Sequence, residues 1–181
     1  SPSGKLPVTF PRVVGQVPLY YAHRSTGKPA SQASFLHIDD IAARTPQAGL
    51  KNASQYLDAG YAPLYEFGYG LSYTSFTYAD IAVAPTRARV GVPISVRAVV
   101  RNVGQVAGDE VAQLYVRDLV GSVTRPVREL KGFQRIHLEP GESREVAFQL
   151  SADDLAFYGR DLTRAVEPGS MVGVNENFAR E

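Results

Sequence analysis

The stretch "PLYEFGYGLSYTSF", residues 63–76, decides how the chain is interpreted. Its bulky side chains alternate at period two with glycine and polar residues, which is typical of an extended chain and not of a helix. After Tyr73 the next aromatic residues change phase, and this predicts a bulge or bend before a first strand. We interpret residues 61–73 as an aromatic linker buried between two domains. The rings expected to make that interdomain contact are Tyr65, Phe67, Tyr69, Tyr73 and Phe76.

Short alternating segments recur from about residue 74 onward, separated by turn signals. Apolar residues at every second position predict half-buried strands in 94–101 and 143–151, and strand 110–118 has partly covered faces on both sides. Two Glu-Pro-Gly sequences, at 139–142 and 167–170, are suited to type II turns with a positive φ at glycine. This pattern predicts a mainly β fold, an immunoglobulin or fibronectin type III-like β-sandwich. The alternative interpretation of residues 63–76 is an apolar first strand of a lone β domain.

The first 60 residues are irregular, and composition limits the partners. One short helix is expected around 38–50, capped by Asp39 or Asp40 and ended before Pro46. The chain has 19 basic and 18 acidic residues among 181, without long runs of either sign, so we expect neither nucleic acid nor membrane as a partner. No signal peptide is visible. The absence of cysteine excludes disulfides and thiolate chemistry within these residues.

Several long motifs in order resemble the C-terminal end of glycoside hydrolase family 3, the β-glucosidase and β-xylosidase group. They lie at residues 4–29, 56–58, 63–76, 108–118 and 122–143. The resemblance implies a three-part enzyme with a catalytic barrel, an α/β sandwich and a fibronectin type III-like domain. Residues 1–60 would then be the end of the α/β sandwich with an extended loop, 61–73 the linker, and 74–181 the fibronectin type III-like domain.

The resemblance also implies a function. The chain would be the C-terminal structural part of a retaining, exo-acting β-glucosidase that removes terminal β-linked glucose. Its catalytic carboxylates would lie upstream, with no catalytic residue in this chain. The implied partners are the upstream barrel and α/β sandwich, in the same protein or a separate chain, and a β-glucoside or oligosaccharide substrate. A homodimer is possible, and no cofactor or metal is expected. The expected location is periplasmic or secreted, in a bacterium.

A different class of function stays open, a non-catalytic carbohydrate-binding or adhesion module. Such a module needs a flat aromatic platform, and tryptophan, the usual sugar-stacking residue, is absent. The rings that would have to form the platform are Tyr115, Phe133, Phe157 and Tyr158.

Two segments supply the candidate residues for the rim of a substrate cleft. Residues 30–55 are longer than the corresponding span of the family and are expected either to reach the cleft or a neighbouring subunit, or to be solvent-exposed decoration. Residues 20–28 combine aromatic, imidazole and guanidinium groups that suit sugars, although a strand end with Arg24 paired to a carboxylate is favoured. The candidates are His37, Asp39, Asp40, Tyr21 and Arg24.

Two further expectations concern the sandwich. Retaining glycoside hydrolysis needs two nearby carboxyl groups, and the acidic residues here sit mostly beside turns, where solvated loops are expected instead of a catalytic pair. The residues so interpreted are Asp109, Glu110, Asp118, Glu139, Glu142, Asp153 and Asp154. The closing segment "SMVGVNENFARE" is several residues shorter than the family pattern, so the last strand is expected to be truncated or displaced.

Overall fold

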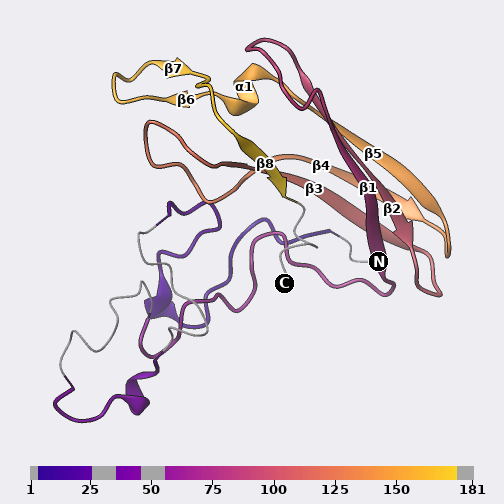
Figure 1. The fold of residues 1–181 in the computed structure, drawn as a ribbon. Coiled ribbons are helices and arrows are strands. Elements are labelled where there is room, and N and C mark those ends of the chain that lie inside the picture. Colours follow the sequence, from indigo (N-terminus) through magenta and orange to yellow (C-terminus); the bar gives the residue numbers. More distant parts are fainter. Residues whose placement is uncertain (1–3, 26–35, 46–55, 175–181) are drawn as a thin grey trace.

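The computed structural model describes residues 4–25, 36–45 and 56–174. Its main body is two antiparallel three-stranded sheets laid face to face, with strand orders β1-β2-β5 and β4-β3-β8 (Figure 1). The strands of the first sheet are β1 Phe76–Ala84, β2 Ile94–Asn102 and β5 Ser143–Leu150. Those of the second are β4 Glu129–Leu138, β3 Gly108–Asp118 and β8 Met171–Val174. The short helix α1 (Ala152–Leu155) leads to the hairpin β6 (Phe157–Tyr158) and β7 (Arg164–Ala165).

The hydrophobic core lies between the two sheets. Val100 of β2, Leu138 of β4 and Val146 of β5 are almost fully buried in one cluster, and Leu114 with Leu150 belongs to a second. The alternation in the sequence predicted the inward faces of β2, β3 and β5 correctly, because strand side chains point to opposite sides at successive positions, whereas β4 was not predicted. The prediction of a mainly β sandwich is therefore confirmed.

The two Glu-Pro-Gly sequences behave differently. Gly141 has φ +80°, and the Glu142 amide donates to the Glu139 carbonyl at 3.0 Å, so this turn forms as predicted. Gly169 does not have a positive φ, and the prediction of a second type II turn is wrong. The segment 167–170 is instead bonded to the residue that follows β3, because the Ser170 carbonyl accepts a hydrogen bond from the Leu119 amide at 3.1 Å.

The N-terminal segment pairs with the linker. Leu6 and Tyr69 are joined by an N–H···O bond of 2.8 Å, and Phe10 and Tyr65 by another of 2.8 Å, which makes a short antiparallel ladder. The linker is not one extended ribbon as predicted, because a turn interrupts it at Gly68, where φ is +83°. The predicted bend before the first strand is present at residues 73–74, and β1 itself carries an irregularity between Ala79 and Ala82.

The expected helix in residues 38–50 is reduced, within the described residues, to one 3-10 turn, Ile38–Asp40. Its N-cap is His37, whose Nδ1 accepts a hydrogen bond from the Asp39 amide at 3.2 Å, so the prediction of an aspartate cap is wrong. Both aspartates lie inside the turn. Residues 46–55 lie outside the described part of the chain.

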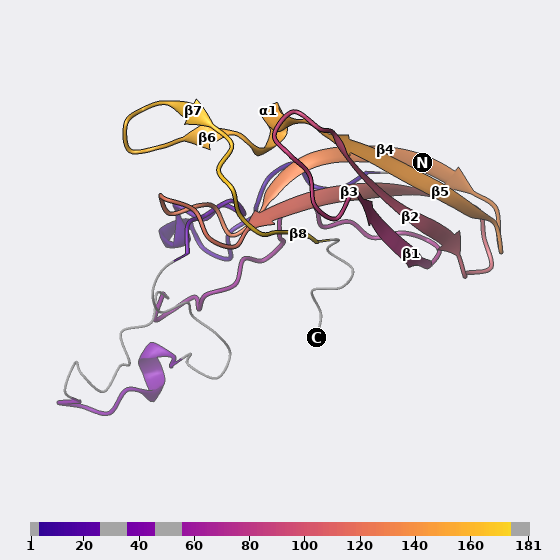
Figure 2. The same cartoon turned by 45° about the horizontal axis from the view of Figure 1, so that its top comes forward.

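The closing strand β8 is four residues long and pairs antiparallel with the end of β3, from Tyr115 to Asp118. It completes the sheet on the side opposite β4, as Figure 2 shows from a second direction. Residues 175–181, which follow β8 directly, lie outside the described part, so the expectation of a truncated or displaced closing strand stays a prediction.

Candidate functional site

Three aromatic rings form a cluster where the linker meets the second sheet. Tyr21 and Phe67 are stacked with ring centroids 4.0 Å apart and an interplanar angle of 15°. Both rings meet Tyr115 of β3 edge-on, at 6.0 and 6.4 Å, and Tyr115 is completely buried. The Tyr21 hydroxyl also accepts a hydrogen bond from the Leu130 amide at 3.3 Å. This aromatic cluster fixes the linker on the outer face of β3 and β4, because offset and edge-on pairs add to the burial energy.

The other rings of the linker do not join the aromatic cluster. Tyr65 packs edge-on against Phe10 at 6.3 Å and lies 5.1 Å from Tyr69. Phe76, the first residue of β1, packs against the core. Tyr73 is 88% exposed. The prediction that all five rings contact another domain stays untested, but Tyr65, Phe67, Tyr69 and Phe76 already have partners within this chain.

A cavity of about 400 Å³ opens beside the aromatic cluster. We call it the tyrosine cavity, because Tyr20, Tyr21 and Tyr61 line it together with Phe67. Its wall also includes the imidazole of His23 and the charged side chains of Glu66, Arg117 and Arg128. The cavity therefore combines aromatic surface with hydrogen-bond donors and one carboxylate acceptor.

The cations of the tyrosine cavity differ in their partners. Arg128 Nη2 lies 3.5 Å from the Glu66 carboxylate, and its guanidinium lies 5.5 Å from the Tyr115 ring centroid. Arg117 is exposed on β3 and has no ion pair within residues 4–25, 36–45 and 56–174. A free guanidinium at the edge of an aromatic cavity is available to hydroxyl or carboxylate oxygens of a ligand.

The five predicted rim residues separate into two places. Tyr21 belongs to the aromatic cluster, and Arg24 forms an isolated β-bridge with Pro126. His37, Asp39 and Asp40 lie on the 3-10 turn, which both views place away from the sheets (Figures 1 and 2).

The histidine of this turn has local partners. Its Nδ1 lies 3.3 Å from the Asp39 carboxylate and its Nε2 lies 3.2 Å from the Asp58 carbonyl. In the described part of the chain no group of three or more histidine, cysteine or acidic side chains is placed to hold a metal. The role of all five residues at a cleft rim remains a proposal.

The acidic residues of the sandwich were only partly interpreted correctly. Glu110 was expected in a solvated loop, but its side chain is buried inside β3. The Tyr78 hydroxyl donates to it at 2.9 Å, and Lys5 Nζ of the N-terminal segment lies 3.5 Å away. One signal in the sequence could have found this residue, because Glu110 has the same phase as the core side chains Ala112, Leu114 and Val116.

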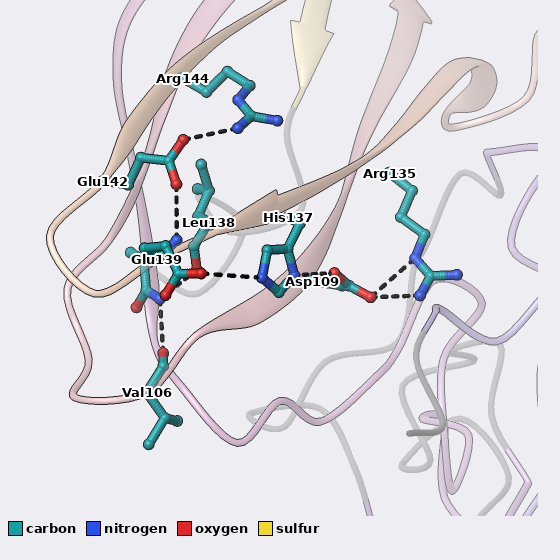
Figure 3. Close-up of polar contacts among 9 residues, drawn as sticks. Val106, Asp109, Arg135, His137, Leu138, Glu139, Glu142 and Arg144 are labelled. Atoms are coloured by element: carbon teal, nitrogen blue, oxygen red, sulfur yellow. Dashed lines mark hydrogen bonds and ion pairs between the residues drawn. The ribbon is translucent and has the colours of Figure 1, made fainter.

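A polar cluster lies at the other end of β4 (Figure 3). Asp109 sits between Arg135, which donates to its Oδ2, and His137, whose Nδ1 lies 2.7 Å from Oδ1. His137 Nε2 also lies 3.7 Å from Glu139. The hydrogen bond from Arg135, followed by the one with His137, lowers the pKa of Asp109, and the bond with Asp109 raises the pKa of His137.

We predict a pH dependence from this polar cluster. The raised pKa of His137 gives stability that is complete below the ordinary histidine pKa and disappears as pH rises through the raised value. The lowered pKa of Asp109 gives stability that is lost as pH falls through that lowered value. Both contributions are complete between about pH 4 and 6.5. An NMR titration of the imidazole should show the His137 pKa returning toward its ordinary value in Asp109→Asn. An unchanged pKa in that variant would contradict the pairing.

Comparisons with known proteins identify the region. Residues 110–173 match the fibronectin type III-like domain family. The chain is 41% identical over 172 residues to a periplasmic β-glucosidase of Salmonella typhimurium, covering 94% of this chain and 20% of that protein. The chain corresponds to the C-terminal, Fn3-like region of family 3 glycoside hydrolases.

The relatives of this region are not all named for the same activity. A putative β-xylosidase of Formosa agariphila is 37% identical over 178 residues, covering 97% of this chain and 20% of that protein. A crystal structure of a β-glucosidase from Listeria innocua in complex with glucose superposes with a TM-score of 0.79 at 33% identity, covering 96% of this chain and 24% of that one. The chain thus spans about a fifth of the length of the curated relatives it matches.

Within the described ranges, no helix has both the length and the apolar character needed to span a membrane.

Proposed function

We propose that the chain is the C-terminal structural part of a retaining, exo-acting β-glucosidase that removes terminal β-linked glucose from oligosaccharides or glucosides. The observation that carries the proposal is the 41% identity to a periplasmic β-glucosidase over 94% of this chain. The same observation supports a periplasmic or secreted location. Catalysis would come from two carboxylates upstream, in a barrel and an α/β sandwich that this chain helps to complete.

The geometry supports a structural role for the first 73 residues. Large apolar side chains remain exposed on this segment, although its ladder and the aromatic cluster are formed. Large exposed apolar side chains support a contact with another body where they gather into a patch. The most exposed members are Val14 at 90%, Leu71 at 87% and Tyr73 at 88%. We propose that upstream domains cover these side chains, with the boundaries 1–60, 61–73 and 74–181 that the sequence predicts.

The alternative function, a carbohydrate-binding module with a flat platform, loses its main support. Tyr115 is completely buried and Phe157 is 6% exposed, so neither ring can present a face to solvent. Phe133 and Tyr158 are exposed, but they lie on different sheets, on β4 and β6. The four rings therefore do not form one platform.

The proposed function is tested by the activity of the purified chain. Residues 1–181 should hydrolyse no aryl β-glucoside, because the two carboxylates that the reaction needs are proposed to lie upstream. The matched sample is the longer polypeptide that includes the upstream domains, which should release the aryl group. Turnover by the pure chain would overturn the proposal. Full activity and unchanged thermal stability of the longer protein after removal of residues 1–181 would overturn the structural role.

A further inference from the structure

We propose that the tyrosine cavity binds a pyranose ring of a neutral saccharide. Only the choice of saccharide as ligand rests on the proposed function, because the cavity itself is a property of this chain. Its volume of about 400 Å³ lies within the range of roughly 300–1,000 Å³ that is usual for small-molecule sites. Its composition also fits the usual pattern of aromatic walls with a few polar groups.

Ring contacts and a hydrogen bond hold the back wall of the tyrosine cavity in place. Tyr21 and Phe67 are stacked on each other, and both rest against the buried ring of Tyr115. The Tyr21 hydroxyl is held by the Leu130 amide. A ligand would therefore not have to order these rings on binding, and this lowers the entropic cost of binding.

Two further rings supply the apolar contact. Tyr20 is 55% exposed and Tyr61 is half-buried, and both line the cavity. A pyranose presents a face of C–H groups, which packs on an aromatic ring, while its hydroxyl groups point outward to polar partners. Burial of that face against tyrosine gives a favourable contribution without requiring a charged ligand.

The polar groups include both donors and an acceptor, as sugar hydroxyls require. Arg117 offers a guanidinium that has no ion pair among the described residues, and Glu66 offers a carboxylate whose side chain is 60% exposed. Arg128, 3.5 Å from Glu66, helps to hold that carboxylate at the cavity. A simple anion would use the arginines but would be repelled by Glu66, whereas a neutral polyol can use all three.

The proposal is tested by NMR titration of the isotopically labelled chain 1–181 with methyl β-glucoside and with cellobiose. We expect saturable shifts at Tyr20, Tyr61 and Arg117, with dissociation constants in the millimolar range. Tyr20→Ala and Arg117→Met should each weaken binding by about three- to tenfold, since an aromatic contact or a hydrogen bond is lost. The matched controls are Tyr158→Ala and Arg101→Met, which remove exposed side chains outside the cavity and should leave binding unchanged.

Three results would overturn the inference. The first is the absence of saturable shifts with either sugar. The second is equal sugar affinity in Tyr20→Ala and the unchanged chain. The third is displacement of the sugar by sodium sulfate at equal or higher affinity, which would show a cationic patch without saccharide recognition. None of these results bears on the aryl-glucoside assay, so failure of this inference and failure of the proposed function are separate outcomes.

Discussion

Replacing Asn102 by alanine should destabilise the chain by about 3 kcal/mol, because it leaves several buried polar groups without partners. Asn102 is completely buried at the end of β2. Its Nδ2 donates to the carbonyls of Val106 at 2.8 Å and Leu138 at 3.0 Å. Its Oδ1 accepts from the Thr74 hydroxyl at 2.6 Å and from the Gly104 amide at 3.0 Å.

The measurement is urea unfolding of the chain, followed by circular dichroism. Thr74→Val is the matched control, because it removes one of the same hydrogen bonds and leaves Asn102 in place; about 1 kcal/mol is expected. If Asn102→Ala cost no more than Thr74→Val, the four hydrogen bonds would not act as the structure indicates.

Replacing Lys5 by methionine should destabilise the chain by about 2 kcal/mol, because removing one member of a buried pair leaves the other charge uncompensated. The Glu110 side chain is 6% exposed, and Lys5 is its only ion-pair partner among the residues described. The Lys5 side chain is itself 19% exposed, so the effect should be smaller than for a fully buried pair.

A double variant separates charge from packing. Lys5→Met combined with Glu110→Gln should recover most of the lost stability, since the amide is neutral and can still accept the hydrogen bond from Tyr78. The free energy of unfolding of each variant is measured in urea. Hydrogen exchange of the Leu6 and Gly68 amides, which donate to the Tyr69 and Leu6 carbonyls, reports the ladder directly. Equal stability of the double and single variants would show that the charge of Glu110 is not the cause.

The sandwich was predictable from the sequence because alternation at period two is preserved along β2 and β5, whereas β1 carries an irregularity between Ala79 and Ala82. The same alternation explains why two polar side chains are buried. Asn102 lies at a buried alternate position of β2, and Glu110 lies at one of β3. What the sequence could not provide was their partners. Asn102 is satisfied by Thr74 and by the carbonyls of two separate segments, and Glu110 by Tyr78 and Lys5.

The candidate site was less predictable, because its residues meet only through tertiary contacts. Tyr21 looked like a ligand-stacking ring, but Phe67, 46 positions later, occupies one of its faces. Arg117 was not singled out at all, since an exposed arginine on a strand has no local signal of function. The wrong prediction of a turn at residues 167–170 has the same origin: the proline and glycine suit a reversal, but a bond from Leu119 holds that segment in another conformation.

The short ladder between residues 5–10 and 64–69 brings the two ends of residues 11–63 together. Because the two ends of residues 11–63 lie side by side, a change in the number of residues between them carries a loop-closure cost that grows only slowly with length. A change of length between the paired ends can therefore leave the ladder itself intact.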